Sequence, residues 1–201
     1  MRPISCLAAA IVALLITPAL AQEGTPTRIR GTIEKLDGQT LIVKSREGQE
    51  LSVMLSNDLK VSAVNKAQLS DIKQGDFIGT AAVPGTDGKL HAQEVLIFPE
   101  ALRGTGEGYR PWDLTPDSTM TNATVAEVAE GAQGRLLKLK YKDGEKDLDV
   151  PTAAPIVTLA PGDPSLLQPG TAVFIPALKA ADGSLAASRV IAGKDGVPPP
   201  M

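Results

Sequence analysis

Short stretches in which apolar and polar residues alternate recur along most of this chain. A period of two places successive side chains on opposite faces of an extended chain, so each stretch predicts a half-buried β-strand. Glycine, proline and aspartate separate the stretches, as is typical of turns in an all-β protein. The predicted strands lie near residues 28–36, 40–46, 49–55, 76–83, 90–97, 123–129, 135–142, 145–150, 171–178 and 185–192.

The two halves of the chain resemble each other. Residues 72–97 match residues 167–192 without gaps, and this alignment superposes Gly75 on Gly170. The upstream segments also correspond once small loop insertions are allowed in the second half. This ordered series of matching turn and core positions predicts two copies of one duplicated unit.

In the first copy, the hairpin between the second and third strands needs a three-residue loop, Arg46-Glu47-Gly48. This loop length keeps apolar residues facing each other, with Val43 opposite Leu51. We expect Gly48 to adopt the left-handed conformation that closes such a loop.

In the second copy, the corresponding hairpin carries Asp143-Gly144, a pair typical of two-residue turns. This turn predicts that Leu137 faces Val150 on one side of the ribbon. On the other side lysines then face acidic residues. We expect a solvated surface there, stabilised by about 0.2–1 kcal/mol per pair.

Each copy has five predicted strands and a short helical turn between the third and fourth, which is the order of an OB-type barrel. The sequence therefore predicts an all-β fold with two tandem OB-like five-stranded small barrels. A β-sandwich formed from both repeats is the alternative. The predicted segments are a first repeat at 22–98, a connecting loop rich in aromatic residues, glycine and proline at 99–122, a second repeat at 123–192 and a proline-rich tail at 193–201.

The tail contains three consecutive prolines, Pro198 to Pro200. Proline has no backbone N–H and cannot donate a ladder hydrogen bond. We expect an extended surface segment, or a disordered one, from Val197 onward.

The first residues predict export. Arg2 precedes an apolar run from Leu7 to Ile16, and the small-residue pattern Ala19-Leu20-Ala21 follows. This is typical of a secretory signal peptide at 1–21, and we expect a periplasmic or secreted mature protein. The apolar run is shorter than the roughly 20 residues of a membrane span, so we expect no transmembrane segment in the mature chain.

The mature chain is mildly acidic. Removing 21 residues from 201 leaves 180, with 19 basic and 23 acidic side chains and a net charge of −4. The predicted strands within 40–55 contain no aromatic residue on which a nucleic-acid base could stack. We therefore expect no nucleic-acid partner.

Few residues offer catalytic or metal-binding chemistry. Cys6 lies in the predicted signal, so the mature chain has no cysteine, and His91 is the only histidine. His91 lies between apolar residues on a predicted strand and should point to solvent. The clustered ligands of a zinc site are absent, and Met120 and Met201 without a histidine are weak copper ligands. We expect no catalytic residue, no metal site and no cofactor.

The connecting loop carries more aromatic surface than a linker needs. Flexible linkers are rich in glycine, serine and charge, whereas this loop contains Tyr109, Arg110 and the only tryptophan, Trp112. Tyrosine, arginine and tryptophan are enriched in binding hot spots. Two interpretations are open. Either Trp112 is a structural plug in the seam between the barrels, or the three residues form part of a ligand or partner site there.

The chain resembles uncharacterised exported bacterial domain-of-unknown-function proteins with tandem OB-like β-barrel repeats. The segments that carry the resemblance are RIRGTIEKLDGQTLIVKSREGQELSVML, LSDIKQGDFIG and DGKLHAQEVLIF. It covers Arg28 to Phe98 well and the second copy more loosely, since Thr171 replaces the aspartate of the Gly-Asp pair. The resemblance implies an OB-like barrel and transfers no catalytic residue.

The leading functional hypothesis is a non-catalytic periplasmic binding or interaction module. Its partner would be an unknown small molecule, an envelope polymer or a protein held at the seam and the connecting loop. We expect a monomer. The alternatives are a carboxylate-based hydrolase acting in the interdomain cleft and a metal-handling accessory protein.

Overall fold

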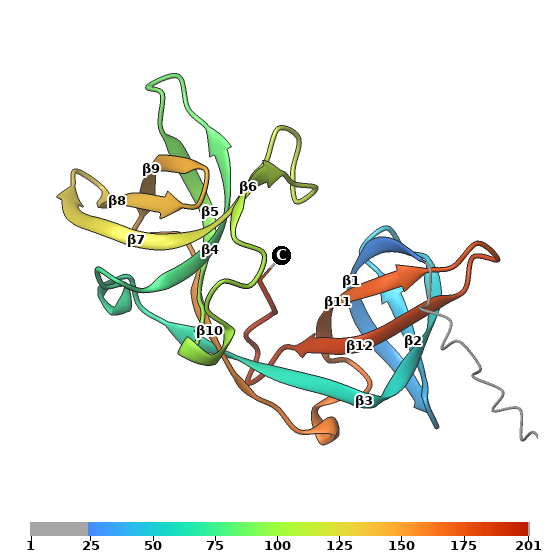
Figure 1. Ribbon diagram of the computed structural model, residues 1–201. Helices are drawn as coiled ribbons and strands as arrows, with labels where there is room; N and C mark the ends of the chain where they lie inside the picture. The colour runs from blue at the N-terminus through green and yellow to red at the C-terminus, as the bar shows by residue number, and fades with distance from the viewer. Residues whose placement is uncertain (1–23, 201) are drawn as a thin grey trace, which may run out of the picture.

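The computed structural model describes residues 24–200, and nearly all of its regular structure is β-strand (Figure 1). The strands form two small barrels, so the predicted all-β barrel fold is confirmed. The signal peptide predicted at 1–21 lies outside the described residues. Within 24–200, no helix is long and apolar enough to cross a membrane.

The first barrel is closed by a parallel pairing of β12 with β3, in which Leu185 lies beside Val53 and Ala192 beside Ala63. All its other neighbouring strands pair antiparallel. In order around the barrel, the strands are β1 (Thr25–Asp37), β2 (Thr40–Ser45), the first part of β3 (Glu50–Ala67), β12 (Leu185–Ala192) and β11 (Ala172–Lys179).

The second barrel repeats this order. A short parallel pairing of β5 with β9, with Leu90 beside Leu148, closes it. Its other neighbouring strands pair antiparallel. In order, the strands are β7 (Thr119–Gly131), β8 (Gly134–Tyr141), β9 (Gly144–Pro151), β5 (Leu90–Ile97) and β4 (Phe77–Pro84).

The two halves of the chain exchange strands. We expected residues 22–98 and 123–192 each to close a separate barrel, and the strand pairing differs from that expectation. Each barrel takes three strands from one half of the chain and two from the other. At matching positions of the two halves the buried strand residues are mostly apolar, as at Ile78 and Val173 or Val95 and Val190, so both ways of closing the barrels would bury similar residues.

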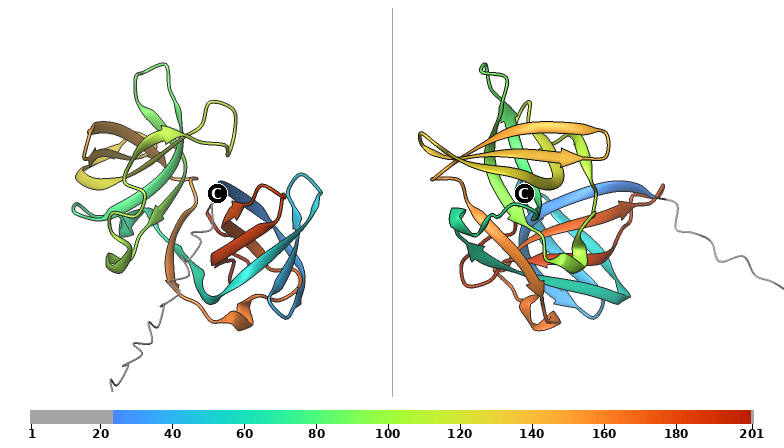
Figure 2. Two further views of the ribbon diagram at one scale, coloured as in Figure 1. Left: turned by 45° about the vertical axis from the view of Figure 1, so that its right-hand side comes forward. Right: turned by 60° about the vertical axis from the view of Figure 1, so that its left-hand side comes forward.

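A crossing ladder between the barrels accompanies the exchange. The second part of β3 pairs antiparallel with β10 (Ile156–Pro161), from Ala67 beside Ile156 to Ser62 beside Pro161. We did not predict strands in these segments. Because both run extended instead of turning back, each carries the chain from one barrel to the other (Figure 2).

Each barrel has its own apolar core, and a third apolar cluster lies between them. Leu41 and Ile175 are fully buried in the first barrel, and Leu139 and Val95 in the second. The third cluster, here called the seam cluster, draws on both barrels and on the crossing ladder. It consists of Val64, Leu96, Val157, Leu159, Phe174 and Ile191.

The first hairpin pairs as predicted. Val43 lies opposite Leu51, and Gly48 has a φ of +85°. The apolar residues on either side of the loop therefore predicted its length correctly.

The second hairpin differs from the prediction by two residues. Tyr141 pairs with Gly144, and Leu137 lies opposite Leu148 instead of Val150. The turn residues are therefore Lys142 and Asp143. A shift of two keeps every side chain on its predicted face. The apolar pattern therefore determines which face of each strand is buried, but it does not determine the register between the two strands.

The connecting segment at 99–122 is ordered and is not a plain loop. It begins with a short 3-10 helix, η2 (Glu100–Leu102), and continues into β6 (Gly108–Pro111). The β6 strand pairs antiparallel with the start of β7, with Arg110 beside Met120. The remaining 3-10 helices are η1 (Leu69–Asp71) and η3 (Pro164–Leu166), which follow the crossing strands β3 and β10.

The tail prediction is wrong in part, because Pro198 is exposed but Val197 and Pro200 are not. Asp195 and Gly196, with φ values of 50° and 78°, form a tight turn that sends the chain back between the barrels (Figure 1). Val197 packs against the seam cluster and Pro200 is buried. Prolines cannot donate to a sheet, but their rings can still bury apolar surface, so a segment that forms no strand can pack in the seam.

Candidate functional site

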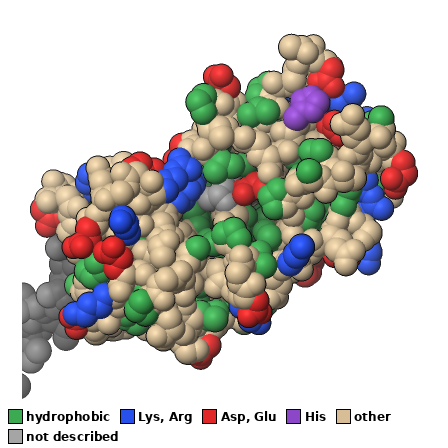
Figure 3. Space-filling model, turned by 180° about the vertical axis from the view of Figure 1, so that it is seen from behind, with side chains coloured by type: hydrophobic (Ala, Val, Ile, Leu, Met, Phe, Trp, Pro, Cys, Tyr) green, Lys and Arg blue, Asp and Glu red, His purple; other side chains and the backbone are tan. Residues whose placement is uncertain are grey.

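A cavity of about 330 Å³ lies between the two barrels. Strands of both barrels, the crossing ladder, the connecting segment and the tail all contribute to its lining. Apolar side chains dominate its walls, and two of them, Phe98 and Leu102, pack against the seam cluster. Seen from behind, hydrophobic side chains gather in the hollow between the barrels (Figure 3). Its size and its apolar walls are those of a small-molecule pocket.

Trp112 forms part of the cavity wall and packs against the seam cluster. Three guanidinium groups surround its indole ring, with carbons 3.9 Å (Arg28), 5.4 Å (Arg110) and 5.8 Å (Arg30) from the ring centroid. These are cation–π distances. Arg28 and Arg30 belong to the first barrel, whereas Arg110 lies on β6 beside the second. Trp112 therefore contacts groups from both sides of the seam.

The β6 strand separates the three residues that the sequence grouped as one candidate site. Arg110 is half-buried and lines the cavity, as Trp112 does. Tyr109 is 39% exposed and faces away, with the Lys146 ammonium 4.5 Å from its ring. Neighbouring residues of a strand point to opposite faces, so Tyr109 and Arg110 do not line one site.

Two ion pairs of Asp113 join the connecting segment to the first barrel. Its carboxylate accepts hydrogen bonds from Arg30 at 2.7 Å and from Arg28 at 3.3 Å. Partial burial raises the pKa of Asp113, but the hydrogen bond from Arg30 and the charges of both arginines outweigh it. The net pKa of Asp113 lies below its ordinary value.

We predict that Asp113 makes the stability of the protein fall in acid. Because the pKa of Asp113 is lower in the folded than in the unfolded chain, its contribution is complete above the unfolded value of about 3.9. The contribution is lost as the pH falls through the folded value. Asp113→Asn should flatten this part of a plot of unfolding free energy against pH. Since the side chain is half exposed, the effect should not exceed about 1 kcal/mol.

Three buried polar atoms beside the cavity have no hydrogen-bond partner. They are Trp112 Nε1, Asn122 Oδ1 and Arg30 Nε. The other end of the Asn122 amide donates to the Thr105 carbonyl at 2.8 Å and fixes the connecting segment to β7. Native proteins contain few buried polar atoms of this kind.

Several residues that line the cavity were not predicted from the sequence. Arg28 on β1, Arg189 on β12 and Phe174 on β11 all line it. On their own strands these are ordinary outward-facing positions. A signal existed in the alternation of Arg28 and Arg30 around buried Ile29, which places both arginines on one outer face. Only the exchange of strands brings that face to the connecting segment.

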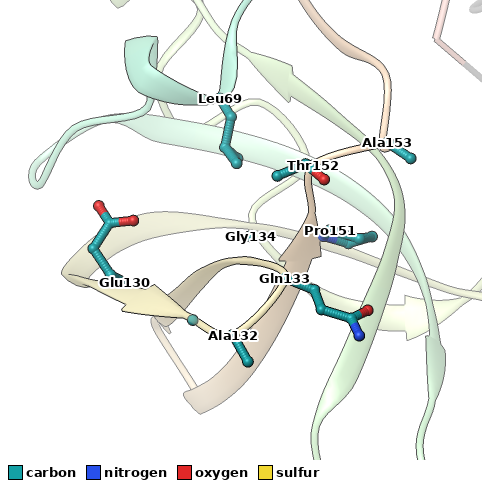
Figure 4. Close-up of a pocket in the computed structure, with 9 residues that line it drawn as sticks. Leu69, Glu130, Ala132, Gln133, Gly134, Pro151, Thr152 and Ala153 are labelled. Carbon is teal, nitrogen blue, oxygen red and sulfur yellow. The ribbon is translucent and has the colours of Figure 1, made fainter.

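A second, larger groove is a weaker candidate. Its volume is about 630 Å³, and it lies between the β7–β8 turn, the end of β9 and η1 (Figure 4). Short side chains and glycine backbone form most of it. Glu130 is the only charged side chain among the described residues that line it, and that side chain is 81% exposed. The groove offers few convergent polar groups to orient a ligand.

The histidine cluster offers no metal site. His91 Nε2 lies 3.1 Å from Asp87 and His91 Nδ1 lies 3.5 Å from Asp149. A hydrogen bond from the Lys89 backbone and one with His91 lower the pKa of Asp87. Among residues 24–200, no group of three or more His, Cys, Asp or Glu side chains could hold a metal ion. Met120 is buried beside Ala81, and Met201 lies outside the described residues.

The sequence matches no known protein-family model and no curated protein, and the fold matches no solved structure. The resemblance to exported domains of unknown function therefore stays a prediction. The geometry of the seam is the basis for any functional assignment.

Proposed function

We propose that this protein is an exported, non-catalytic binding module that holds a small molecule in the cavity between its barrels. The observation that carries the proposal is the cavity itself. It is about 330 Å³ in volume, mainly apolar and bordered by Trp112 and Arg110. A few polar groups at the edge of an apolar pocket are the usual means of orienting a small ligand.

The strand order supports a binding module of the OB-like type. In both barrels the three strands of one half pair in sequence, and the last two strands of the other half complete the barrel with a parallel closing pair. We propose that the chain arose by duplication of one such unit. Its binding site would then lie between the two barrels and not on the outer face of either.

The alternative of a carboxylate-based hydrolase gains no support at the seam. Among the described residues that line the cavity, none is aspartate or glutamate. A pair of carboxyl groups beside the substrate is what that chemistry requires.

The proposal is tested with the neutral fluorescent probe N-phenyl-1-naphthylamine and a variant that fills the cavity. Ser62 is a half-buried lining residue on β3, so Ser62→Phe should place a ring in the cavity. Ser52→Phe is the matched control, because Ser52 lies on the same strand and is exposed outside the cavity.

Wild-type protein and Ser52→Phe should both enhance the probe's fluorescence to saturation, with energy transfer from Trp112, the only tryptophan. Ser62→Phe should bind at least about ten-fold more weakly while keeping a cooperative thermal transition. Equal binding by all three proteins would place the probe elsewhere and contradict the proposal.

A further inference from the structure

We infer that the ligand of the seam cavity is an anionic amphiphile, with one negatively charged head group facing the arginines and an apolar body against the seam cluster. This inference rests on the proposed function and adds the chemical class of the ligand. Four features of the site support it.

The first feature is the placement of positive charge. Arg28 on β1, Arg110 on β6 and Arg189 on β12 all line the cavity. They come from three strands that are far apart in the sequence, and the exchange of strands brings them together. No acidic side chain is among the described lining residues.

The second feature is a shortage of carboxylates nearby. Asp113 is the carboxylate that pairs with Arg28 and Arg30. Within residues 24–200, neither Arg110 nor Arg189 has an ion-pair partner. Arg110 donates one hydrogen bond, from Nη1 to the Gly106 carbonyl at 2.8 Å. Among residues 24–200, the cluster therefore carries more positive charge than neighbouring carboxylates neutralise.

The third feature is the environment of Arg110. Burial disfavours its charged form, and the nearby charge of Arg28 adds to this, so the pKa of Arg110 is lowered. An arginine stays protonated in proteins even so. A bound anion would relieve both effects, because it would pair with the guanidinium and reduce the repulsion between Arg110 and Arg28.

The fourth feature is the apolar body of the cavity. Phe98, Leu159, Phe174 and Ile191 line it, and a fully polar anion would leave the cavity-facing side of this apolar wall uncovered. A chain or ring system beside the charged group buries this surface. The small volume of the cavity and the net negative charge of the whole chain favour a single small anion over a nucleic acid or another polyanion.

The test compares two probes that share one ring system. N-Phenyl-1-naphthylamine is neutral, and 8-anilino-1-naphthalenesulfonate is the same skeleton with one sulfonate. We expect the sulfonate to bind wild-type protein at least about ten-fold more tightly at low salt, with the preference shrinking as salt is added. Decanoate should displace it, whereas a decyltrimethylammonium salt should not.

Arg110→Gln is the variant that removes the unpaired charge. We expect it to weaken sulfonate binding about ten-fold, in line with the loss of a hydrogen bond to a charged group, and to leave binding of the neutral probe within about two-fold. Arg103→Gln is the matched control. Arg103 pairs with Glu100 outside the cavity. Its replacement should leave the affinity for both probes unchanged.

The outcomes separate this inference from the proposed function. If neither probe binds in the cavity, the proposed function is wrong and the inference falls with it. If both probes bind equally, or if Arg110→Gln keeps the full sulfonate preference, the cavity binds small molecules but the anionic class is wrong.

Discussion

A chain cut at the exposed turn around Gly104 is expected to remain one folded particle. Gly104 is exposed in the turn after η2, so a protease site inserted there should be cleaved without disturbing a barrel. Separation of the fragments would remove two strands from each barrel and open both cores. The fragments should therefore stay together until the protein unfolds.

Size-exclusion chromatography at nanomolar concentration measures this result. The cut protein should elute with the intact chain and separate only in denaturant. The same cut can be made in the Trp112→Ala variant. This substitution removes a side chain that packs in the seam but leaves the strand exchange in place, so the fragments should still co-elute. Two separate fragments that each keep a folded β-sheet spectrum would show independent barrels and no exchange.

Replacement of Trp112 by alanine is expected to lower the free energy of unfolding by about 2 kcal/mol and to loosen the seam. Truncation of a fully buried tryptophan costs roughly 3–5 kcal/mol, and Trp112 is only half-buried. The lost contacts join the connecting segment to the seam cluster and to Arg28. Denaturant unfolding and hydrogen exchange of the crossing ladder measure the two effects.

Tyr109→Ala is the matched control for this prediction. Tyr109 lies on the same connecting segment and is 39% exposed outside the cavity. Its loss should change the free energy of unfolding by less than about 1 kcal/mol, in the range of surface substitutions. If both variants lose the same stability and the ladder exchanges at its wild-type rate, Trp112 does not hold the seam.

The strand pattern was largely predictable because it depends on neighbours in the sequence. Alternation of apolar and polar residues located the ten strands of the two barrels, and the apolar residues beside Arg46-Glu47-Gly48 set the first hairpin loop. The second hairpin shows where this signal ends. A shift of two residues at Lys142 and Asp143 buries the same face.

The candidate site was predictable only in part. The unusual composition of the connecting segment identified Trp112 and Arg110, and both line the cavity. It also suggested Tyr109, but side chains alternate between the two faces of β6, and that of Tyr109 points away from the cavity. Arg28 and Arg189 were not identified, because an outward-facing arginine on a strand has no distinctive local pattern.

The sequence by itself determined that this protein is built of short strands in barrels and which face of each strand is buried, since these properties follow from side-chain periodicity. The tertiary structure decided which half of the chain completes each barrel. Equivalent strands of the two halves offer nearly the same apolar surface, so the choice depends on β3 and β10 running extended as a crossing ladder. The cavity exists only as a consequence of that choice, because its walls come from strands that approach one another after the exchange.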